Sequence, residues 1–125
     1  MHEMGIVAGI LEASGDAARS AGASRINEIH IRVGELTEVV DDALDFAFES
    51  LSPGTPAEGA RLIVERVGAR SRCLECDVTF DHGRFDAACP ECGAFLCELL
   101  QGRELVVDHI DIDLPGDELT GEGRA

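Results

Sequence analysis

The stretch Cys73-Leu74-Glu75-Cys76, followed after twelve residues by Cys89-Pro90-Glu91-Cys92-Gly93, decides how the fold of this chain is interpreted. Two C-x2-C pairs this close offer four thiolates, and four sulfur ligands are typical of a closed tetrahedral zinc site. The turn after each pair needs a residue that tolerates positive φ, and Asp77 and Gly93 stand at these two positions. The pattern therefore predicts a four-cysteine zinc ribbon.

Other interpretations of the four cysteines are a pair of disulfides, buried free cysteines, and a four-sulfur iron site as in rubredoxin-type electron carriers. Disulfides would suit an oxidising compartment, and no signal peptide indicates one. Iron takes the same ligands as zinc, so the spacing does not separate these two metals. The fifth cysteine, Cys97, lies outside the spacing of the two pairs and is interpreted as a small buried apolar residue.

Charge and hydropathy narrow the classes of function. The chain has 125 residues, with 10 basic against 25 acidic side chains and a formal net charge of -15. A ribbon that binds nucleic acid needs clustered Lys and Arg to contact phosphates, and this sequence has no such cluster. No apolar run approaches the roughly 18 residues of a membrane span. We therefore expect a soluble, cytoplasmic protein without nucleic-acid or membrane partners.

Hydrophobic periodicity predicts two helices. The first covers residues 4 to 21, and its apolar stripe consists of Met4, Val7, Leu11, Ala18 and Ala21. The second covers residues 41 to 51, with an apolar face made of Leu44, Ala47, Phe48 and Leu51.

Alternation of apolar and polar residues predicts three strands, at 26 to 33, 60 to 67 and 104 to 114. His30 and His109 fall on polar faces of the first and third strands, so we expect both at the surface. His82 lies between the two cysteine pairs and is a candidate for contact with the zinc site.

These segments predict an α+β fold with two helices packed on a small three-stranded sheet and an inserted four-cysteine zinc ribbon. The expected divisions are an α+β domain formed by 1 to 69 and 100 to 114, a zinc ribbon from 70 to 99, and a disordered acidic tail from 115 to 125. The ribbon has few apolar residues besides Phe80, Phe85 and Phe95, so zinc should be its main source of stability.

The amino-terminal residues Met1-His2-Glu3 form a second candidate metal site. A terminal amine, the next backbone amides and an imidazole can hold Ni(II) or Cu(II) in a square plane. Binding requires a neutral imidazole and should weaken as the pH falls through the histidine range. By composition alone this signal is weak, because an early histidine is common and chain termini are usually frayed.

Several motifs, in this order along the chain, resemble the HypA/HybF family of hydrogenase maturation proteins. They are Met1-His2-Glu3-Met4, Val33-Gly34-Glu35-Leu36, the run from 43 to 49, Gly54-Thr55, Glu58-Gly59-Ala60, the two C-x2-C pairs, and Gly102-Arg103-Glu104-Leu105 with Ile110. The resemblance covers residues 1 to about 113.

The resemblance implies a nickel metallochaperone, without enzyme activity, that supplies Ni(II) for the maturation of nickel-iron hydrogenase. It implies that Met1, His2 and Glu3 bind the transferred nickel within the α+β domain. It assigns structural zinc to the residues Cys73, Cys76, Cys89 and Cys92.

The partners that the resemblance implies are a GTP-hydrolysing HypB-like protein, the hydrogenase large subunit and, in some organisms, urease maturation proteins. Family members commonly have Ser where this chain has Gly5. Because Ser is a good helix cap and Gly a poor helix former, this difference puts in doubt whether the first helix begins as early as in those members. A zinc-stapled adaptor protein that does not transfer nickel is the alternative function.

Overall fold

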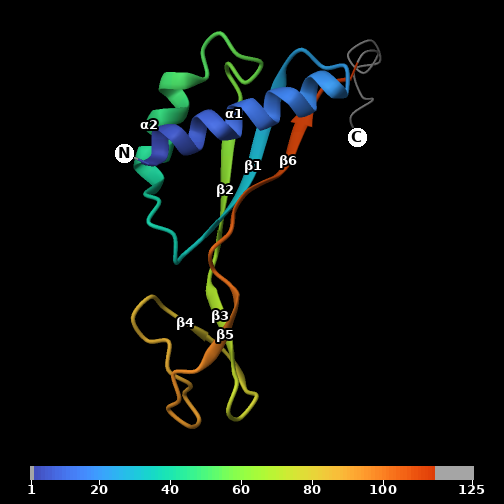
Figure 1. The fold of residues 1–125 in the computed structure, drawn as a ribbon. Coiled ribbons are helices and arrows are strands. Elements are labelled where there is room, and N and C mark those ends of the chain that lie inside the picture. Colours follow the sequence, from blue (N-terminus) through green and yellow to red (C-terminus); the bar gives the residue numbers. More distant parts are fainter. Residues whose placement is uncertain (1, 115–125) are drawn as a thin grey trace. The chain divides into compact units, whose positions relative to one another are not determined.

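The computed structural model describes residues 2 to 114, without the side chain of His2; the predicted acidic tail lies outside the described residues. Along the chain the elements are α1 (His2–Ser20), β1 (Ile26–Gly34), α2 (Asp41–Leu51), β2 (Arg61–Val67), β3 (Ala69–Cys73), β4 (Thr79–His82), β5 (Cys97–Gln101) and β6 (Leu105–Ile112) (Figure 1). They form two three-stranded sheets, ordered β2-β1-β6 and β4-β3-β5.

The described chain separates into two compact units. The first unit consists of residues 2–31, 39–64 and 106–114, and the second unit of residues 32–38 and 65–105. Both helices belong to the first unit, and the four cysteines belong to the second.

Both predicted helices are present, but the buried face of α1 differs from the prediction. The helix begins at His2, so Gly5 does not delay its start. Met4, expected in the apolar stripe, is 41% exposed. The buried side chains of α1 are Glu3, Val7, Ile10, Ser14 and Ala18. Helical periodicity is compatible with burial of several neighbouring faces of α1. Packing against the rest of the first unit buries the face that carries two polar residues, Glu3 and Ser14.

β1 is the central strand of the larger sheet and shows the predicted alternation. Ile29, Ile31 and Val33 are at most 1% exposed, and burying each such side chain contributes roughly 1.5–3 kcal/mol. The colours of Figure 1 show that β1 and β2 run in one direction and β6 in the other. Together with α1 and α2, this mixed sheet gives the predicted α+β arrangement.

The second sheet is a small antiparallel layer. β3 pairs with β4, with Ser71 opposite Phe80, and with β5, with Cys73 opposite Cys97. The hydrophobic cluster around the cysteines has three buried members, Cys73, Phe80 and Cys89. The other two ribbon phenylalanines, at 85 and 95, are 93% and 82% exposed. So few buried apolar groups support the expectation that a bound metal stabilises this unit.

Two glycines allow a close backbone approach in the second unit. A Cβ atom on Gly34 would lie 2.0 Å from the carbonyl oxygen of Gly102, which has a φ of +128°. The N–H of Gly34 donates to the Glu104 carbonyl at 2.7 Å, and the N–H of Leu36 donates to the Gly102 carbonyl at 2.9 Å. This junction fixes the backbone on both sides of Arg103.

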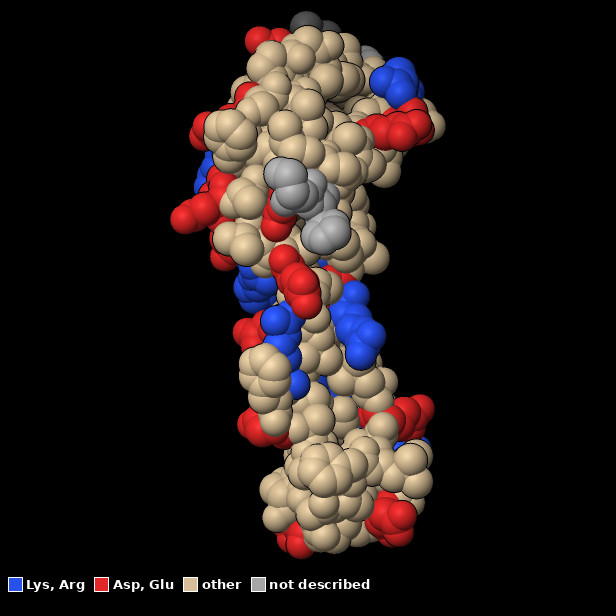
Figure 2. Space-filling view, turned by 60° about the vertical axis from the view of Figure 1, so that its left-hand side comes forward, with Lys and Arg blue, Asp and Glu red and all other residues tan. Residues whose placement is uncertain are grey.

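Acidic side chains are spread over the face of the molecule shown in Figure 2, with smaller groups of basic side chains between them. Within residues 2 to 114, no helix has both the length and the apolar character required to cross a membrane.

Candidate metal centre

Two turns with matching backbone hydrogen bonds hold the four cysteines. In the first turn, the N–H of Cys73 donates to the carbonyl of Val78 at 2.8 Å, five residues later. In the second, the N–H of Cys89 donates to the carbonyl of Ala94 at the same distance and the same separation. The two C-x2-C segments are therefore folded alike, which follows from their common spacing.

The residue after each C-x2-C pair adopts the left-handed conformation that the sequence predicted. Asp77 has a φ of 70° and Gly93 a φ of 77°. Their N–H groups donate to the carbonyls of Cys73 and Cys89 at 2.9 and 2.8 Å, closing each turn. Arg72 also donates to the carboxylate of Asp77 at 2.5 Å, which ties the first turn to β3.

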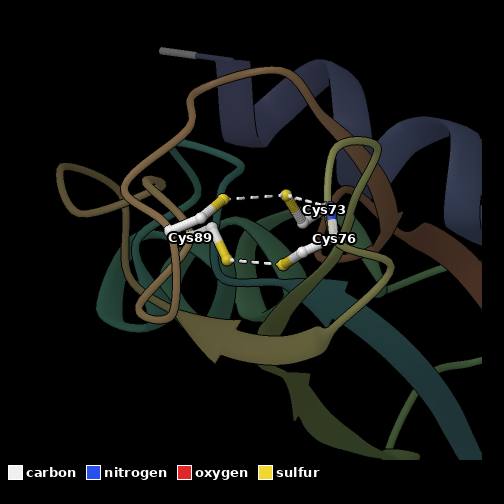
Figure 3. A group of neighbouring side chains, drawn as sticks. Cys73, Cys76 and Cys89 are labelled. Atoms are coloured by element: carbon white, nitrogen blue, oxygen red, sulfur yellow. Dashed lines mark hydrogen bonds between the residues drawn. The ribbon is translucent and has the colours of Figure 1, made fainter.

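The four sulfur atoms converge on one point between the two turns. The Sγ atoms of Cys73 and Cys92 are 3.6 Å apart, as are those of Cys76 and Cys89. All four lie within 4.8 Å of one another, and Figure 3 shows the sulfurs turned toward each other from the two turns. Zinc–sulfur bonds of about 2.3 Å place tetrahedral sulfurs roughly 3.8 Å apart. The donor set and its spacing fit a tetrahedral zinc ion.

Backbone N–H groups stabilise a thiolate at Cys73. The amide nitrogens of Glu75 and Cys76 lie 3.3 and 3.4 Å from its Sγ atom. The N–H of Cys76 is the main reason that the pKa of Cys73 falls to about 6. At Cys76 the N–H of Val78 lowers the pKa, but the thiol of Cys89 and burial outweigh it and raise the pKa to about 12. Full ionisation of the group therefore requires a cation that neutralises the clustered charge.

Cys97 and His82 stand outside the four-sulfur group. Burial raises the pKa of Cys97, and its Sγ atom lies 3.7 Å from the carbonyl oxygen of Ala94, so it remains a packed thiol. The Nε2 atom of His82 is 2.8 Å from Ser71 Oγ, and its Nδ1 atom is 2.7 Å from the carbonyl oxygen of Gly83. Both ring nitrogens are engaged there, so His82 contributes no ligand to the cysteine group in this structure.

Of the amino-terminal candidates, Met1 and the His2 side chain lie outside the described part, whereas Glu3 is described fully. Glu3 is only 6% exposed, and its Oε2 atom accepts a hydrogen bond from the N–H of Val40 at 3.2 Å. Hydrogen bonds from the amino terminus and from the N–H groups of Glu3 and Val40 lower the pKa of Glu3 to about 2. Its carboxylate connects α1 to the residue before α2, an arrangement that the periodicity of α1 did not predict.

The structure also brings together two histidines that are far apart in sequence. The rings of His30 and His109 stack with centroids 4.0 Å apart and an interplanar angle of 19°. Glu28 lies 2.8 Å from Nε2 of His30, and Asp108 lies 2.7 Å from Nδ1 of His109. Nitrogen lone pairs of stacked rings lie in nearly parallel planes and do not converge on one ion. The pair is therefore a packing feature of neighbouring strands.

Comparisons with known proteins agree with this geometry. The family model described as "Hydrogenase/urease nickel incorporation, metallochaperone, hypA" matches residues 1–112. The chain is 36% identical over 113 residues to the hydrogenase maturation factor HypA of Geotalea uraniireducens, and 40% identical over 113 residues to that of Chlorobaculum tepidum. Each of these alignments covers 90% of this chain and 100% of the relative.

Two solution structures share the fold. One is that of the Ni metallochaperone HypA from Helicobacter pylori, with a TM-score of 0.67, 16% identity, and coverage of 90% of this chain and 98% of that chain. The other is that of a HypA protein, with a TM-score of 0.70, 20% identity, and coverage of 92% and 98%. The match of the family model over nearly the whole chain, the identity to curated relatives and the four-cysteine group lead to one conclusion. The chain belongs to the HypA family of hydrogenase maturation nickel metallochaperones.

Proposed function

We propose that the protein binds Ni(II) at Met1-His2-Glu3 and delivers it during the maturation of nickel-iron hydrogenase. The observation that carries this proposal is the family match that begins at residue 1, over a sequence that reads Met1-His2-Glu3. The ligands would be the terminal amine, the imidazole of His2 and the backbone nitrogens between them, a set that suits Ni(II).

The start of α1 at His2 supports this ligand set. The first four N–H groups of a helix have no acceptor within the helix. The backbone nitrogens of His2 and Glu3 are therefore not required for helical hydrogen bonds. Because the carboxylate of Glu3 is hydrogen-bonded to Val40, we assign Glu3 a positioning role, in which it holds the first turn of α1 against the rest of the first unit.

In this proposal the zinc held by Cys73, Cys76, Cys89 and Cys92 is structural. Four protein ligands complete a tetrahedral zinc ion and leave no position for a water or a substrate. The metal would supply charge neutralisation and crosslinking between the two turns. Nickel transfer is thereby assigned to the first unit, which contains the amino-terminal helix.

The partners that we propose are a GTP-hydrolysing HypB-like protein and the hydrogenase large subunit. The family description names both hydrogenase and urease, so urease maturation proteins are further candidates. We also propose that the protein works in the cytoplasm, where thiols are kept reduced, because a four-cysteine zinc site requires reduced cysteines.

Nickel binding to the zinc-loaded protein tests the proposal. Three forms are compared by calorimetry: the native chain, His2→Ala, and a chain with one residue added before Met1. We expect the native chain to bind one nickel ion and both altered chains to lose that binding while retaining zinc. His109→Ala, which changes a histidine of the first unit outside the proposed site, is the control and should bind nickel normally.

Equal nickel binding by all three forms would exclude the terminal site. An adaptor protein that is stabilised by zinc and does not transfer nickel would then be the better interpretation of the function. A further readout is pH, because binding through a neutral imidazole weakens as the pH falls through about 6.5.

A further inference from the structure

A pocket of about 360 Å³ lies within the second unit, apart from the four-sulfur group. Its apolar lining includes Leu36, Ala87, Phe95 and Leu99. The segment before α2, the strands β3 and β5, and the segment after β4 all contribute side chains to it. No role assigned so far uses this pocket.

The charged lining of the pocket has the opposite sign to the chain as a whole. Arg84 and Arg103 line it together with one carboxylate, that of Glu38, whereas the whole chain has a formal net charge of -15. The Arg84 guanidinium is 3.8 Å from the Glu38 carboxylate and 3.5 Å from the carbonyl oxygen of Leu36, so both contacts are long. The pocket therefore presents a local excess of positive charge.

Arg103 supplies most of the hydrogen-bond donors of the pocket that have no acceptor. Among residues 2 to 114, its guanidinium has neither an ion-pair partner nor a hydrogen-bond acceptor. Arg70 on β3, in contrast, contacts Asp81 at 2.8 Å. The approach of Gly34 to Gly102 fixes the backbone beside Arg103, and the side chain of Arg103 lines the pocket.

The other polar groups of the pocket are already satisfied. The Nδ1 atom of His82 faces the carbonyl oxygen of Gly83 at 2.7 Å, so this nitrogen carries the proton when the ring is neutral. The Nε2 atom then accepts a hydrogen bond from the hydroxyl of Ser71 at 2.8 Å. The guanidinium groups are thus left as the donors that are available to a ligand.

Part of the apolar lining of the pocket is exposed. Phe95 is 82% exposed although it belongs to the lining. The other exposed large apolar side chains of the second unit do not line the pocket; they are Leu74, Phe85, Leu96, Leu100 and Leu105. A pocket whose lining includes so exposed a phenylalanine suits a polypeptide better than a small solute, which would leave that ring in water.

We propose that this pocket binds a peptide segment of a partner protein in which a carboxylate stands beside a large apolar side chain. The carboxylate pairs with Arg103 and Arg84, and the apolar side chain packs against Phe95 and Leu99. Charge complementarity selects the acidic segment, and the apolar lining selects its neighbour. The inference goes beyond nickel carriage, because it concerns another surface and needs no nickel.

The test uses the full zinc-loaded chain, labelled with 15N, and the peptide acetyl-Gly-Leu-Glu-Leu-Gly-amide. We expect dose-dependent shifts of the backbone amides at Leu36, Leu99 and Arg103. Arg103→Gln should weaken binding by about fivefold, as expected for an exposed charge pair. Arg70→Gln, which removes an arginine outside the pocket, should leave the affinity unchanged.

Phenylalanine variants test the apolar half of the pocket. Phe95→Ala should weaken binding of the peptide severalfold, and Phe85→Ala should not, although both residues are strongly exposed. A second peptide has Gln in place of Glu and therefore lacks the carboxylate. Its affinity for the native chain should be no higher than the affinity of the original peptide for Arg103→Gln.

Three outcomes of the peptide titrations would overturn the proposal. They are the absence of any shift at millimolar peptide, equal affinity of the Arg103 and Arg70 variants, and equal affinity of the Glu and Gln peptides. Sodium acetate at the same concentration should not reproduce the shifts; if it does, the pocket holds an adventitious anion only. Nickel binding is also measured on each variant, so that a failure of this proposal can be told apart from a failure of the terminal nickel site.

Discussion

The carboxylate of Glu3 accepts a hydrogen bond from the backbone N–H of Val40 at 3.2 Å, linking the first turn of α1 to the residue that caps α2. The side chain of Val40 has no polar atom, so the N-cap residue of α2 makes no capping hydrogen bond through its side chain. Glu3 therefore places a remote negative charge near the amino-terminal end of α2, where the helix dipole favours it.

The hydrogen bonds that the Glu3 carboxylate accepts, from the amino terminus and from the N–H groups of Glu3 and Val40, predict a dependence of stability on pH. The pKa of Glu3 is lowered from its ordinary value of 4.5 to about 2. A carboxyl group with a lowered pKa stabilises the fold fully above pH 4.5 and loses that contribution as the pH falls through about 2. We expect Glu3→Gln to lower the urea midpoint at pH 7, and the difference from the native chain to shrink between pH 4.5 and 2.

Glu12→Gln, on an exposed position of the same helix, is the matched control. It changes the same charge without a buried hydrogen bond, and both variants carry the same zinc. The interpretation of Glu3 fails if the two variants show the same pH profile.

The four-sulfur group predicts a sharp difference between two cysteine variants. Cys76→Ser removes one of the converging ligands, so we expect metal content to fall from about one zinc per chain to near zero, with loss of dispersed amide signals from β3 to β5. Cys97→Ser removes a thiol outside the group and should retain the zinc. Metal analysis and 15N spectra measure both effects, and an unchanged zinc affinity of Cys76→Ser would argue against the cysteine group as the site.

The approach of Gly34 to Gly102 predicts that Gly34→Ala is destabilising. The added Cβ would lie 2.0 Å from the carbonyl oxygen and 2.2 Å from the carbonyl carbon of Gly102, so the backbone must move. Overpacking of this kind costs about 1–3 kcal/mol of unfolding free energy. Gly9→Ala, at a helical site with nothing within 4 Å, should instead gain about 1 kcal/mol. Denaturant unfolding of both variants would reveal whether their signs differ as expected.

Ser14 offers a stabilising substitution. Its side chain is 1% exposed, and its hydroxyl oxygen has no hydrogen-bond partner within the described chain. Ser14→Ala removes an unsatisfied buried polar group and favours the helix, so we expect the free energy of unfolding to rise by about 1–2 kcal/mol. Ser20→Ala at the exposed end of α1 is the control, and an equal effect of both substitutions would argue against burial as the cause.

The short-range features of this protein follow from the sequence alone. The spacing of Cys73, Cys76, Cys89 and Cys92 determines two turns of the same kind, because each turn is closed by hydrogen bonds within six residues. The left-handed conformation after each pair, the helix over 41 to 51 and the alternation in β1 are also local, since they depend on residue type and period.

The tertiary structure decided the features that join distant segments. Periodicity placed Met4 on the inward face of α1, but packing against the rest of the first unit buries Glu3 and uses its carboxylate at Val40. The stacking of His30 on His109 and the free guanidinium of Arg103 also depend on which strands and turns become neighbours. The sequence determines which faces a helix or strand can present. Only the packing of segments far apart in the chain selects one of them, because that choice depends on the total burial and hydrogen bonding of both partners.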